Sequence, residues 1–194
     1  MPKLWTDTVE THRREVRDAV LHATWKLVSE GGALAVTMSQ VAAEVGIGRA
    51  TLYKYFPDVE SILRAWHEQQ VEAHLAQLTE LRDKSGDPAA ALAAVLGGYA
   101  KICWHRTRHG VDGLEGVLHR AVDGVRGVDR LHALFTDVLR DAAGAGAVRS
   151  DVAPGELASY CVHALAAAGH VPSKPAVERL VGVVVAGLAP IPEG

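Results

Sequence analysis

Five polar side chains in one short segment combine the chemistry needed to hold a nucleic acid. Arg49 can donate two hydrogen bonds to one guanine, and the methyl group of Thr51 can pack against a thymine methyl. The hydroxyl groups of Tyr53 and Tyr55 and the ammonium group of Lys54 suit phosphate oxygens. Seven helical residues span about 10 Å, which fits a major groove about 12 Å wide. The segment therefore indicates a helix that reads duplex DNA.

A preceding short helix and a tight turn are expected to present this segment. Thr37 and Gln40 have the spacing of a capping box, which pairs the free backbone N–H groups at a helix start. Ala42 is small enough to let two helix backbones approach each other. Gly46 stops the helix after about two turns, because glycine tolerates the positive φ of a tight turn. Together these residues predict the first half of a helix-turn-helix motif.

The DNA-reading helix is expected to run from Arg49 to Tyr55 and to end at Pro57, since the residue before a proline avoids the helical conformation. Ile47 and Leu52 should face inward and seal a small core with the first helix. That first helix should end near residues 31–32.

Helical periodicity continues through the rest of the chain, so the predicted fold class is all-α with about nine helices. Glycine and proline residues mark the ends of most segments. The further helices are expected from Asp58 for some 20 residues and near 88–108, 112–122, 128–143, 154–169 and 174–189.

The composition is that of an ordinary globular protein, with 48% apolar and 22% charged residues and a net charge of −3. It excludes a disordered or collagen-like chain. The bulk charge gives no indication of nucleic-acid or membrane binding. Two cysteines do not form a disulfide framework, and no leader or membrane segment is visible, so a cytoplasmic protein with no membrane association is expected.

The run G-I-G-R-A-T-L-Y-K-Y-F-P, preceded by E-G-G-A-L-A-V-T-M-S-Q-V-A-A-E, resembles the DNA-binding domain of the TetR/AcrR family of transcriptional regulators over about residues 10–64. The resemblance implies a homodimeric repressor that binds a double-stranded DNA operator and responds to a small-molecule effector of unknown identity. It implies a helix-turn-helix domain over 1–57 and an effector-binding and dimerisation domain over 58–194. Together with Lys54, which suits phosphate by its own chemistry, the residues placed at DNA are Thr37, Ser39, Arg49, Ala50, Thr51, Tyr53 and Tyr55.

One position departs from the family pattern. Many members carry a lysine that grips the DNA backbone at the start of the fourth helix, where this chain has Val59. Residues 1–65 hold eight basic and eight acidic side chains, so counterion release should come from a local patch alone. We expect modest nonspecific affinity and a shallow salt dependence. The patch comprises Arg49 and Lys54, with Arg13, Arg14 and Arg17 as further candidates.

The later helices indicate an apolar effector pocket against the fourth helix, although each of its residues also suits ordinary core packing. The expected lining is Trp66, Tyr99, Cys103, Trp104, Leu118, Leu131 and Phe135. The helices at 154–169 and 174–189 carry apolar stripes that can close a four-helix bundle across a twofold axis, which predicts a homodimer.

Other chemistry has weaker support in the sequence. His105 and His109 share a helical face and could bind zinc or an acidic group, but Cys103 points away from them, and a polar helix edge explains the pair. The motifs of serine hydrolases, zinc proteases and P-loop enzymes are missing from the sequence, so no catalytic residue, metal or cofactor is predicted. The alternatives to a repressor are a helical interaction protein that has lost DNA binding and, with less support, an all-helical enzyme.

Overall fold

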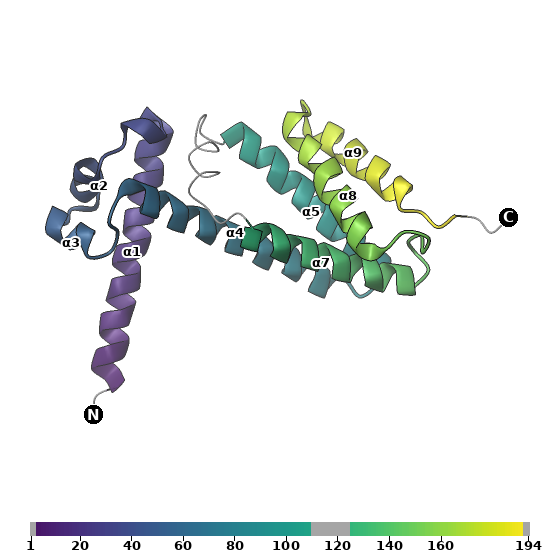
Figure 1. Ribbon diagram of the computed structural model, residues 1–194, viewed down its shortest axis with the longest axis horizontal. Coiled ribbons are helices and arrows are strands. Elements are labelled where there is room, and N and C mark those ends of the chain that lie inside the picture. Colours follow the sequence, from purple (N-terminus) through teal and green to yellow (C-terminus); the bar gives the residue numbers. More distant parts are fainter. Residues whose placement is uncertain (1–2, 110–124, 192–194) are drawn as a thin grey trace. The chain divides into compact units, whose positions relative to one another are not determined.

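Helices account for the regular structure in a computed structural model that describes residues 3–109 and 125–191 (Figure 1). These residues contain eight α-helices, two short 3₁₀ helices and no strand, which confirms the predicted all-α class. The described chain forms two compact units. Unit 1 comprises residues 3–70, and unit 2 comprises residues 71–109 and 125–191.

Unit 1 is built around a small apolar core, to which each of its helices contributes. Leu52 and Phe56 enter this core from the second half of the motif, and Met38, Val41 and Ala42 enter it from the first half. The elements are α1 (Lys3–Gly31), η1 (Ala33–Ala35), α2 (Met38–Val45), α3 (Arg49–Tyr53) and the beginning of α4 (Val59–Lys84).

Helix α4 begins one residue later than expected, because Asp58 caps it. The backbone N–H of Ser61 donates to Oδ1 of Asp58 at 2.7 Å, which satisfies one of the free donors of the first turn. The indole rings of Trp25 on α1 and Trp66 on α4 lie parallel, with their centroids 4.0 Å apart. The first turns of α4 are therefore part of the unit 1 core.

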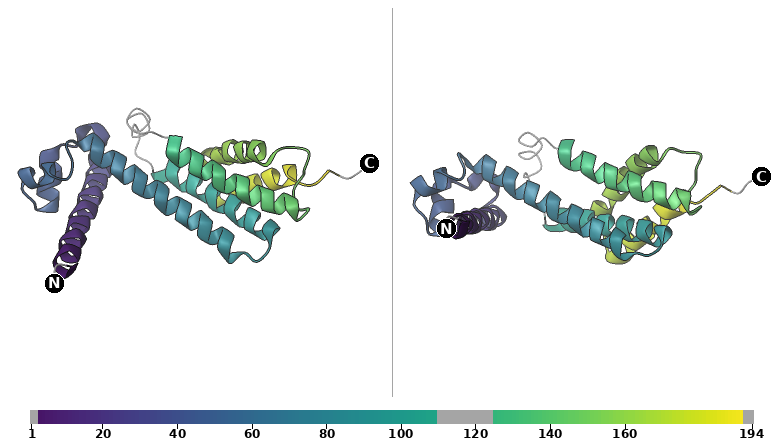
Figure 2. Two further views of the ribbon diagram at one scale, coloured as in Figure 1. Left: turned by 60° about the horizontal axis from the view of Figure 1, so that its bottom comes forward. Right: turned by 90° about the horizontal axis from the view of Figure 1, so that it is seen from below.

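Unit 2 is a helical bundle in which α5 packs against several of the other helices (Figure 2). Its core surrounds the fully buried side chains of Leu96, Phe135, Leu139 and Leu165. Besides the remainder of α4, the elements are α5 (Pro88–His109), α7 (Val125–Gly144), α8 (Pro154–Ala166), η2 (Ala167–His170) and α9 (Lys174–Gly187).

The predicted helices of unit 2 agree with these elements to within a few residues at most ends. The predicted helix 154–169 is divided in the structure, since its last turn tightens into the 3₁₀ helix η2. The expected helix 112–122 lies outside the described residues.

Candidate functional site

Helix α3 separates its side chains into a packed side and an exposed side. Leu52 is fully buried, whereas Arg49, Ala50, Thr51 and Lys54 are exposed. The side chain of Tyr53 is 48% exposed. Tyr55 differs from its neighbours, because it is partly buried and packs against the unit 1 core.

The turn before α3 has the conformation that the sequence predicts. Gly46 adopts φ 75° and ψ 28°, which is the left-handed region. After this reversal the N–H of Ile47 donates to the carbonyl of Ala42 at 3.0 Å, which fixes the chain close to α2. Gly48 is extended, with φ −66°, and its carbonyl accepts the N–H groups of Thr51 and Leu52. The turn thus sets which side of α3 faces the solvent.

The start of α2 carries the predicted capping box. The N–H of Gln40 donates to Oγ1 of Thr37 at 3.3 Å, and the N–H of Thr37 donates to Oε1 of Gln40 at 2.9 Å. Thr37 and Ser39 are both exposed beside this cap.

The charges around α3 come from three elements of unit 1. Arg49 and Lys54 are exposed on and beside α3, and the guanidinium carbon of Arg17 on α1 lies 4.8 Å from the ring centroid of Phe56. On α4, Glu60 pairs with Arg64 at 3.2 Å. Val59 is partly buried and packs against the unit 1 core, which explains in physical terms why an apolar residue suits this position.

The predicted effector residues are divided between two cores. Cys103, Trp104 and Phe135 are buried in unit 2. The ring of Tyr99 meets that of Phe135 edge to face, with centroids 5.3 Å apart. Leu131 is partly buried against the same core.

Two of the predicted effector residues do not join this group. Trp66 packs in unit 1 against Trp25, so it belongs to the core of the helix-turn-helix unit. Leu118 lies outside the described residues. The structure therefore brings Tyr99, Cys103, Trp104, Leu131 and Phe135 together as packed side chains of the unit 2 core.

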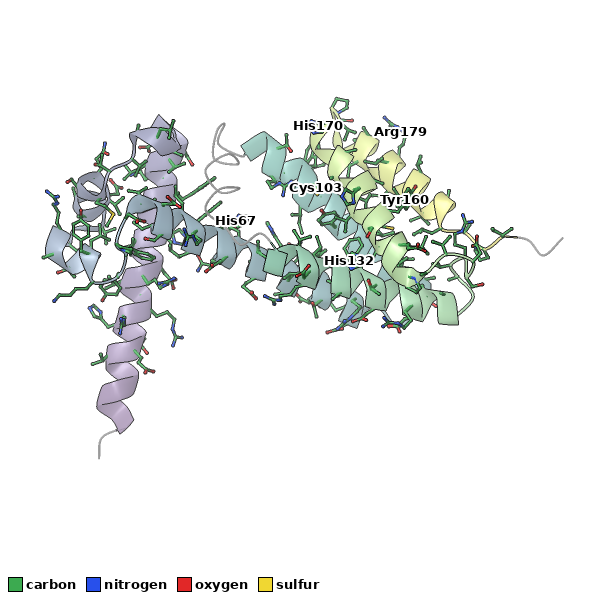
Figure 3. The ribbon with its side chains drawn as sticks, in the orientation of Figure 1. His67, Cys103, His132, Tyr160, His170 and Arg179 are labelled. Carbon is green, nitrogen blue, oxygen red and sulfur yellow. The ribbon has the colours of Figure 1, made fainter. Side chains whose placement is uncertain are left out.

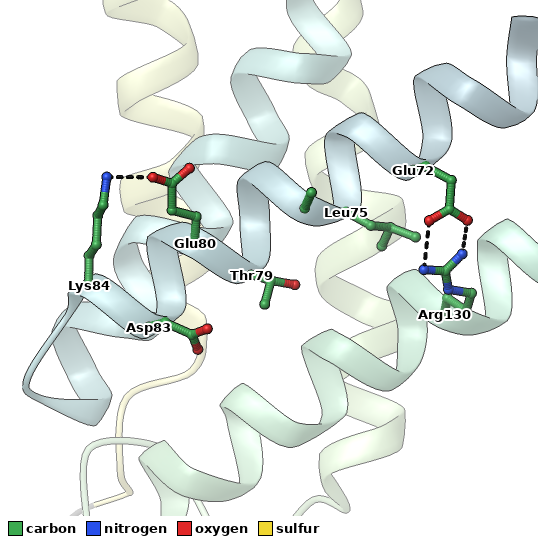
Figure 4. Close-up of a pocket in the computed structure, with 8 residues that line it drawn as sticks. Glu72, Leu75, Thr79, Glu80, Asp83, Lys84 and Arg130 are labelled. Atoms are coloured by element: carbon green, nitrogen blue, oxygen red, sulfur yellow. Dashed lines mark hydrogen bonds and ion pairs between the residues drawn. The ribbon is translucent and has the colours of Figure 1, made fainter. Parts of the chain in front are cut away.

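A groove of about 520 Å³ lies in unit 2, and other residues line it (Figure 4). The side chain of Arg130 on α7 forms a two-pronged ion pair with Glu72 on α4, and Nη2 of Arg130 lies 3.0 Å from Oε2 of Glu72. Hydrogen bonding from Arg130 holds the pKa of the Glu72 carboxyl below its ordinary value. The lining residues are Glu72, Leu75, Ala76, Thr79, Glu80, Asp83, Lys84 and Arg130.

The sequence does not predict this groove, because its lining residues have the same pattern as any solvent-exposed helix face. Charged residues at helical spacing along α4, such as Glu72, Glu80 and Asp83, have the pattern of a solvated helix face. Whether such a face borders a groove depends on the position of α7, which the pattern of α4 does not contain.

Both cysteines are buried thiols of unit 2 (Figure 3 shows Cys103 on α5). Burial raises the pKa of Cys161 to about 12, and burial also raises the pKa of Cys103. Burial and the neighbouring Cys103 thiol raise the pKa of Tyr99 as well. These groups are therefore neutral at physiological pH, which suits packing more than nucleophilic chemistry.

Helices α8 and α9 expose apolar side chains. Tyr160 on α8 is 45% exposed and lies next to Gly187 of α9, where an added Cβ would be 3.2 Å from its hydroxyl oxygen (Figure 3). On α9 the side chain of Val183 is 65% exposed. Both side chains lie on the helices for which the sequence predicts a dimer interface.

Two further observations concern the described residues only. Within 3–109 and 125–191, no group of three or more His, Cys, Asp or Glu side chains is placed to hold a metal ion. In the same part of the chain, no helix is both long enough and apolar enough to cross a membrane.

Comparison with known protein families identifies two regions of the chain. Residues 20–66 match the model described as bacterial regulatory proteins of the tetR family. Residues 87–190 match the model of the C-terminal domain of SbtR-like transcriptional regulators. The second match alone covers more than half of the chain.

Individual proteins resemble the chain more distantly. The nucleoid occlusion factor SlmA from two strains of Haemophilus influenzae is 33% identical over 78 residues, which are 40% of this chain and 34% of SlmA. The chain thus spans about a third of the length of these relatives.

Two solved structures share the fold. A TetR/AcrR regulator from Thermobifida fusca has a TM-score of 0.75 at 15% identity, over 88% of this chain and 97% of its own. AibR, solved in complex with isovaleryl coenzyme A and operator DNA, has a TM-score of 0.63 at 18% identity, over 90% and 98% of the two chains.

Proposed function

The chain belongs to the TetR family of bacterial transcriptional regulators, and from this premise we propose that it is a ligand-responsive repressor. In this proposal a homodimer binds a pseudo-palindromic DNA operator, and a small-molecule effector releases it. Members of the family are transcription factors and not enzymes, so the chemistry of the protein is that of binding.

The observation that carries the proposal is the division of α3 into two sides. Leu52 is buried, while Arg49 and Thr51 are exposed on a helix that follows a left-handed turn at Gly46, and Lys54 is exposed directly after this helix. A guanidinium group and a hydroxyl group at the solvent side can reach base edges in a major groove, and the ammonium group can reach a phosphate. We assign Arg49 and Thr51 to bases, and Tyr53 and Lys54 to the backbone.

Three further residues complete the proposed contact surface. Thr37 and Ser39 are exposed at the start of α2, from which they can reach the phosphates beside the groove. Ala50 is exposed on α3 and can approach a base closely, because its side chain is a single methyl group. Tyr55 is partly buried, so we propose that its ring fixes α3 against the core and that its hydroxyl contacts the DNA backbone.

The exposed apolar residues of α8 and α9 support a homodimer. Two such helices from each of two copies can form a four-helix bundle with twofold symmetry. The two α3 helices would then enter successive major grooves, about one helical turn of DNA apart.

The effector is proposed to bind unit 2. AibR was solved with isovaleryl coenzyme A and operator DNA together, which supports a small-molecule site and a DNA site on one chain of this fold. In the part of unit 2 that the structure describes, the groove bordered by Glu72 and Arg130 is one place where a ligand could bind. Repacking of the core around Tyr99 and Phe135 could open another. An effector releases the DNA only if it binds the state of the protein that cannot bind DNA more tightly than the state that can.

The test is a binding titration with the DNA that flanks the gene of this protein. Fluorescence anisotropy should show tight binding to one site and much weaker binding to a scrambled duplex of the same length. Sedimentation should give two chains per operator. Equal affinity for both duplexes, or no binding, would instead support a helical interaction protein that has lost DNA recognition, an alternative that the balanced charge of residues 1–65 keeps open.

A further inference from the structure

Helix α4 is one helix that belongs to both units, because it runs from Val59 to Lys84 and the boundary between the units falls after residue 70. The part of α4 in unit 2 approaches two other helices closely, once at Val71 and once at Leu81. Ten helical residues separate these two positions by about 15 Å. Two contacts at this separation define the direction of α4 within unit 2.

The contact near the end of α4 is made with α5. A Cβ added to Gly98 would lie 2.6 Å from Cδ1 of Leu81 and 3.0 Å from Cδ2 of Leu78, so the absence of a side chain at Gly98 allows the two helices to come this close. Leu78 is almost fully buried in the unit 2 core. This contact therefore anchors the half of α4 that is farther from unit 1 along the chain.

The contact near the start of this part of α4 is made with α7. A Cβ added to Gly127 would lie 3.0 Å from Cγ1 of Val71. One residue further along α4, the carboxylate of Glu72 accepts hydrogen bonds from both terminal nitrogens of Arg130 (Figure 4). A two-pronged pair fixes the angle between its groups as well as their distance. We call Val71, Glu72, Gly127 and Arg130 the α4–α7 junction.

The α4–α7 junction is easier to open than the contact at Gly98. The side chains of Glu72 and Arg130 are 59% and 54% exposed, and exposed ion pairs are weak because water competes for their groups. Directly beyond the junction, α4 borders the groove of about 520 Å³ through Ala76 and Thr79. Release of the junction would thus leave α4 held by the apolar contacts farther along the helix.

The position of the junction gives it leverage on unit 1. Ile62 on α4 is fully buried in the unit 1 core, against which α3 packs through Leu52. Ile62 lies about 28 Å from Leu81 along the helix, which is about twice the distance of Val71 from Leu81. If α4 tilts about the Gly98 contact, a displacement at Val71 is therefore about doubled at Ile62.

We propose that Glu72 and Arg130 are positioning residues for DNA recognition, which set the direction in which α4 leaves unit 2 and with it the separation of the two α3 helices in a dimer. This inference rests on the proposed function, because the separation matters only for a dimer on an operator with two half-sites. A displacement of about 1 Å at Val71 becomes about 2 Å at Ile62 in each of two protomers, which is comparable to the length of one base pair.

The test measures affinity for the operator and for duplexes in which the spacer between the half-sites is one or two base pairs shorter or longer. The wild type should prefer one spacer. In Glu72→Gln and in Arg130→Gln this preference should weaken by about two- to fivefold, which is what an exposed ion pair can contribute. Discrimination against base changes within a half-site should stay unchanged, since α3 itself is intact.

Further charge variants separate geometry from charge. Arg130→Lys keeps the charge but cannot form the two-pronged pair, so it should weaken the spacer preference nearly as much as Arg130→Gln. The exchanged pair Glu72→Arg/Arg130→Glu should recover the preference, which a merely local effect of either single change does not predict. Arg140→Gln breaks an exposed ion pair with Asp137 inside α7 and is the matched control, with the wild-type spacer preference.

A steric pair tests the other half of the junction. Gly127→Val places a side chain against Val71 and should move the preferred spacer by about one base pair, by the leverage given above. Val71→Ala in the same chain makes room for the new side chain and should return the preferred spacer to that of the wild type.

The outcomes distinguish the inference from the function on which it depends. If the wild type binds the operator specifically but accepts every spacer equally, or if the variants keep its spacer preference, the junction does not position α3 and the proposed function stands. If the wild type has no operator preference, the proposed function fails. Hydrogen exchange then tests the junction without DNA, because Glu72→Gln should speed amide exchange in residues 70–76 by about two- to fivefold. Unchanged exchange would overturn the inference.

Discussion

The two units of the chain differ in where their function is expected to reside. In unit 1 it lies on an outer surface, where Arg49 and Thr51 are exposed because Leu52 is buried. In unit 2 it depends on space between helices, and residues such as Tyr99 and Phe135 fill a core in the same way as in any helical bundle. A binding surface can thus be inferred from residue types and periodicity, whereas a cavity depends on how whole helices pack.

The largest expected effect comes from a variant that tests whether unit 1 is stabilised independently of unit 2. Leu52→Ala removes a fully buried side chain and should lower the free energy of unfolding of unit 1 by about 2–5 kcal/mol, with loss of DNA binding. Tryptophan fluorescence during urea unfolding reports this loss through Trp25 and Trp66 of unit 1, if it is measured in a Trp104→Phe background that removes the tryptophan buried in unit 2. Leu34→Ala, at a side chain that is 93% exposed, is the matched control and should behave as the wild type.

The cysteines report whether unit 2 unfolds together with unit 1. Cys103 and Cys161 both lie in unit 2, so their reaction with a thiol reagent reports the opening of that unit alone. In Leu52→Ala the reaction should stay as slow as in the wild type. If the thiols became reactive at the same urea concentration at which the tryptophan signal changes, the two units would unfold as one.

The second prediction concerns the chemistry of the exposed side of α3. Arg49→Ala should retain the fold and reduce the discrimination against one changed base pair by about 1–3 kcal/mol. Tyr53→Phe should weaken binding to all sequences alike, because a lost phosphate contact carries no sequence information. Competition titrations with single-base operator variants measure both effects. An Arg49→Ala variant with wild-type discrimination, or a Tyr53→Phe variant with altered base preference, would contradict the assigned roles.

The third prediction separates the two glycines of the turn. Gly46 has a positive φ, and Gly46→Ala should destabilise unit 1 by about 1–2 kcal/mol, the cost of a side chain in the left-handed region. Gly48 has φ −66°, and an added Cβ would lie 3.8 Å from Oγ1 of Thr51, which is an ordinary contact. Gly48→Ala should therefore stay within about 0.5 kcal/mol of the wild type. Urea unfolding of the two variants measures the difference, and equal losses would argue against the role given to Gly46.

The last effect is negligible at neutral pH and confined to high pH and to unit 2. In the unfolded chain Cys161 ionises near its ordinary pKa of 9.0, whereas the folded protein keeps the thiol protonated up to a pKa of about 12. The unfolded state thus binds fewer protons above pH 9, so stability should fall as the pH rises from about 9 to 12 and should be unaffected below that range. The difference in this slope between the wild type and Cys161→Ala isolates the thiol from other titrating groups. Identical slopes would mean that Cys161 is accessible to water.

Local interactions explain which features of unit 1 could be predicted. The capping box of Thr37 and Gln40 and the turn at Gly46 depend on residues within a few positions of one another, so the sequence contains them completely. The inward direction of Leu52 follows from helical periodicity. The start of α1 at Lys3 was not predicted, whereas the end of this helix was expected near residues 31–32.

The features of unit 2 that could not be predicted depend on which helices pack against each other. Helix α4 has one apolar stripe, but Ile62 packs in unit 1 while Leu75 and Leu78 pack in unit 2. Periodicity identifies the stripe without identifying the partner of each residue, so Trp66 was grouped with side chains of the wrong core. The groove beside Glu72 was missed for the same reason.

The parallel stack of Trp25 and Trp66 has a consequence for how a signal can reach the DNA-reading helix. Two indole rings with an interplanar angle of 6° resist sliding and twisting against each other, so the first turns of α4 and the second half of α1 form one stiff piece. If the proposed effector rotates α4, this stacked pair should carry the movement into the core on which the DNA-reading helix packs. Replacing either indole with a smaller aromatic ring should loosen this contact and weaken the effect of an effector on DNA binding.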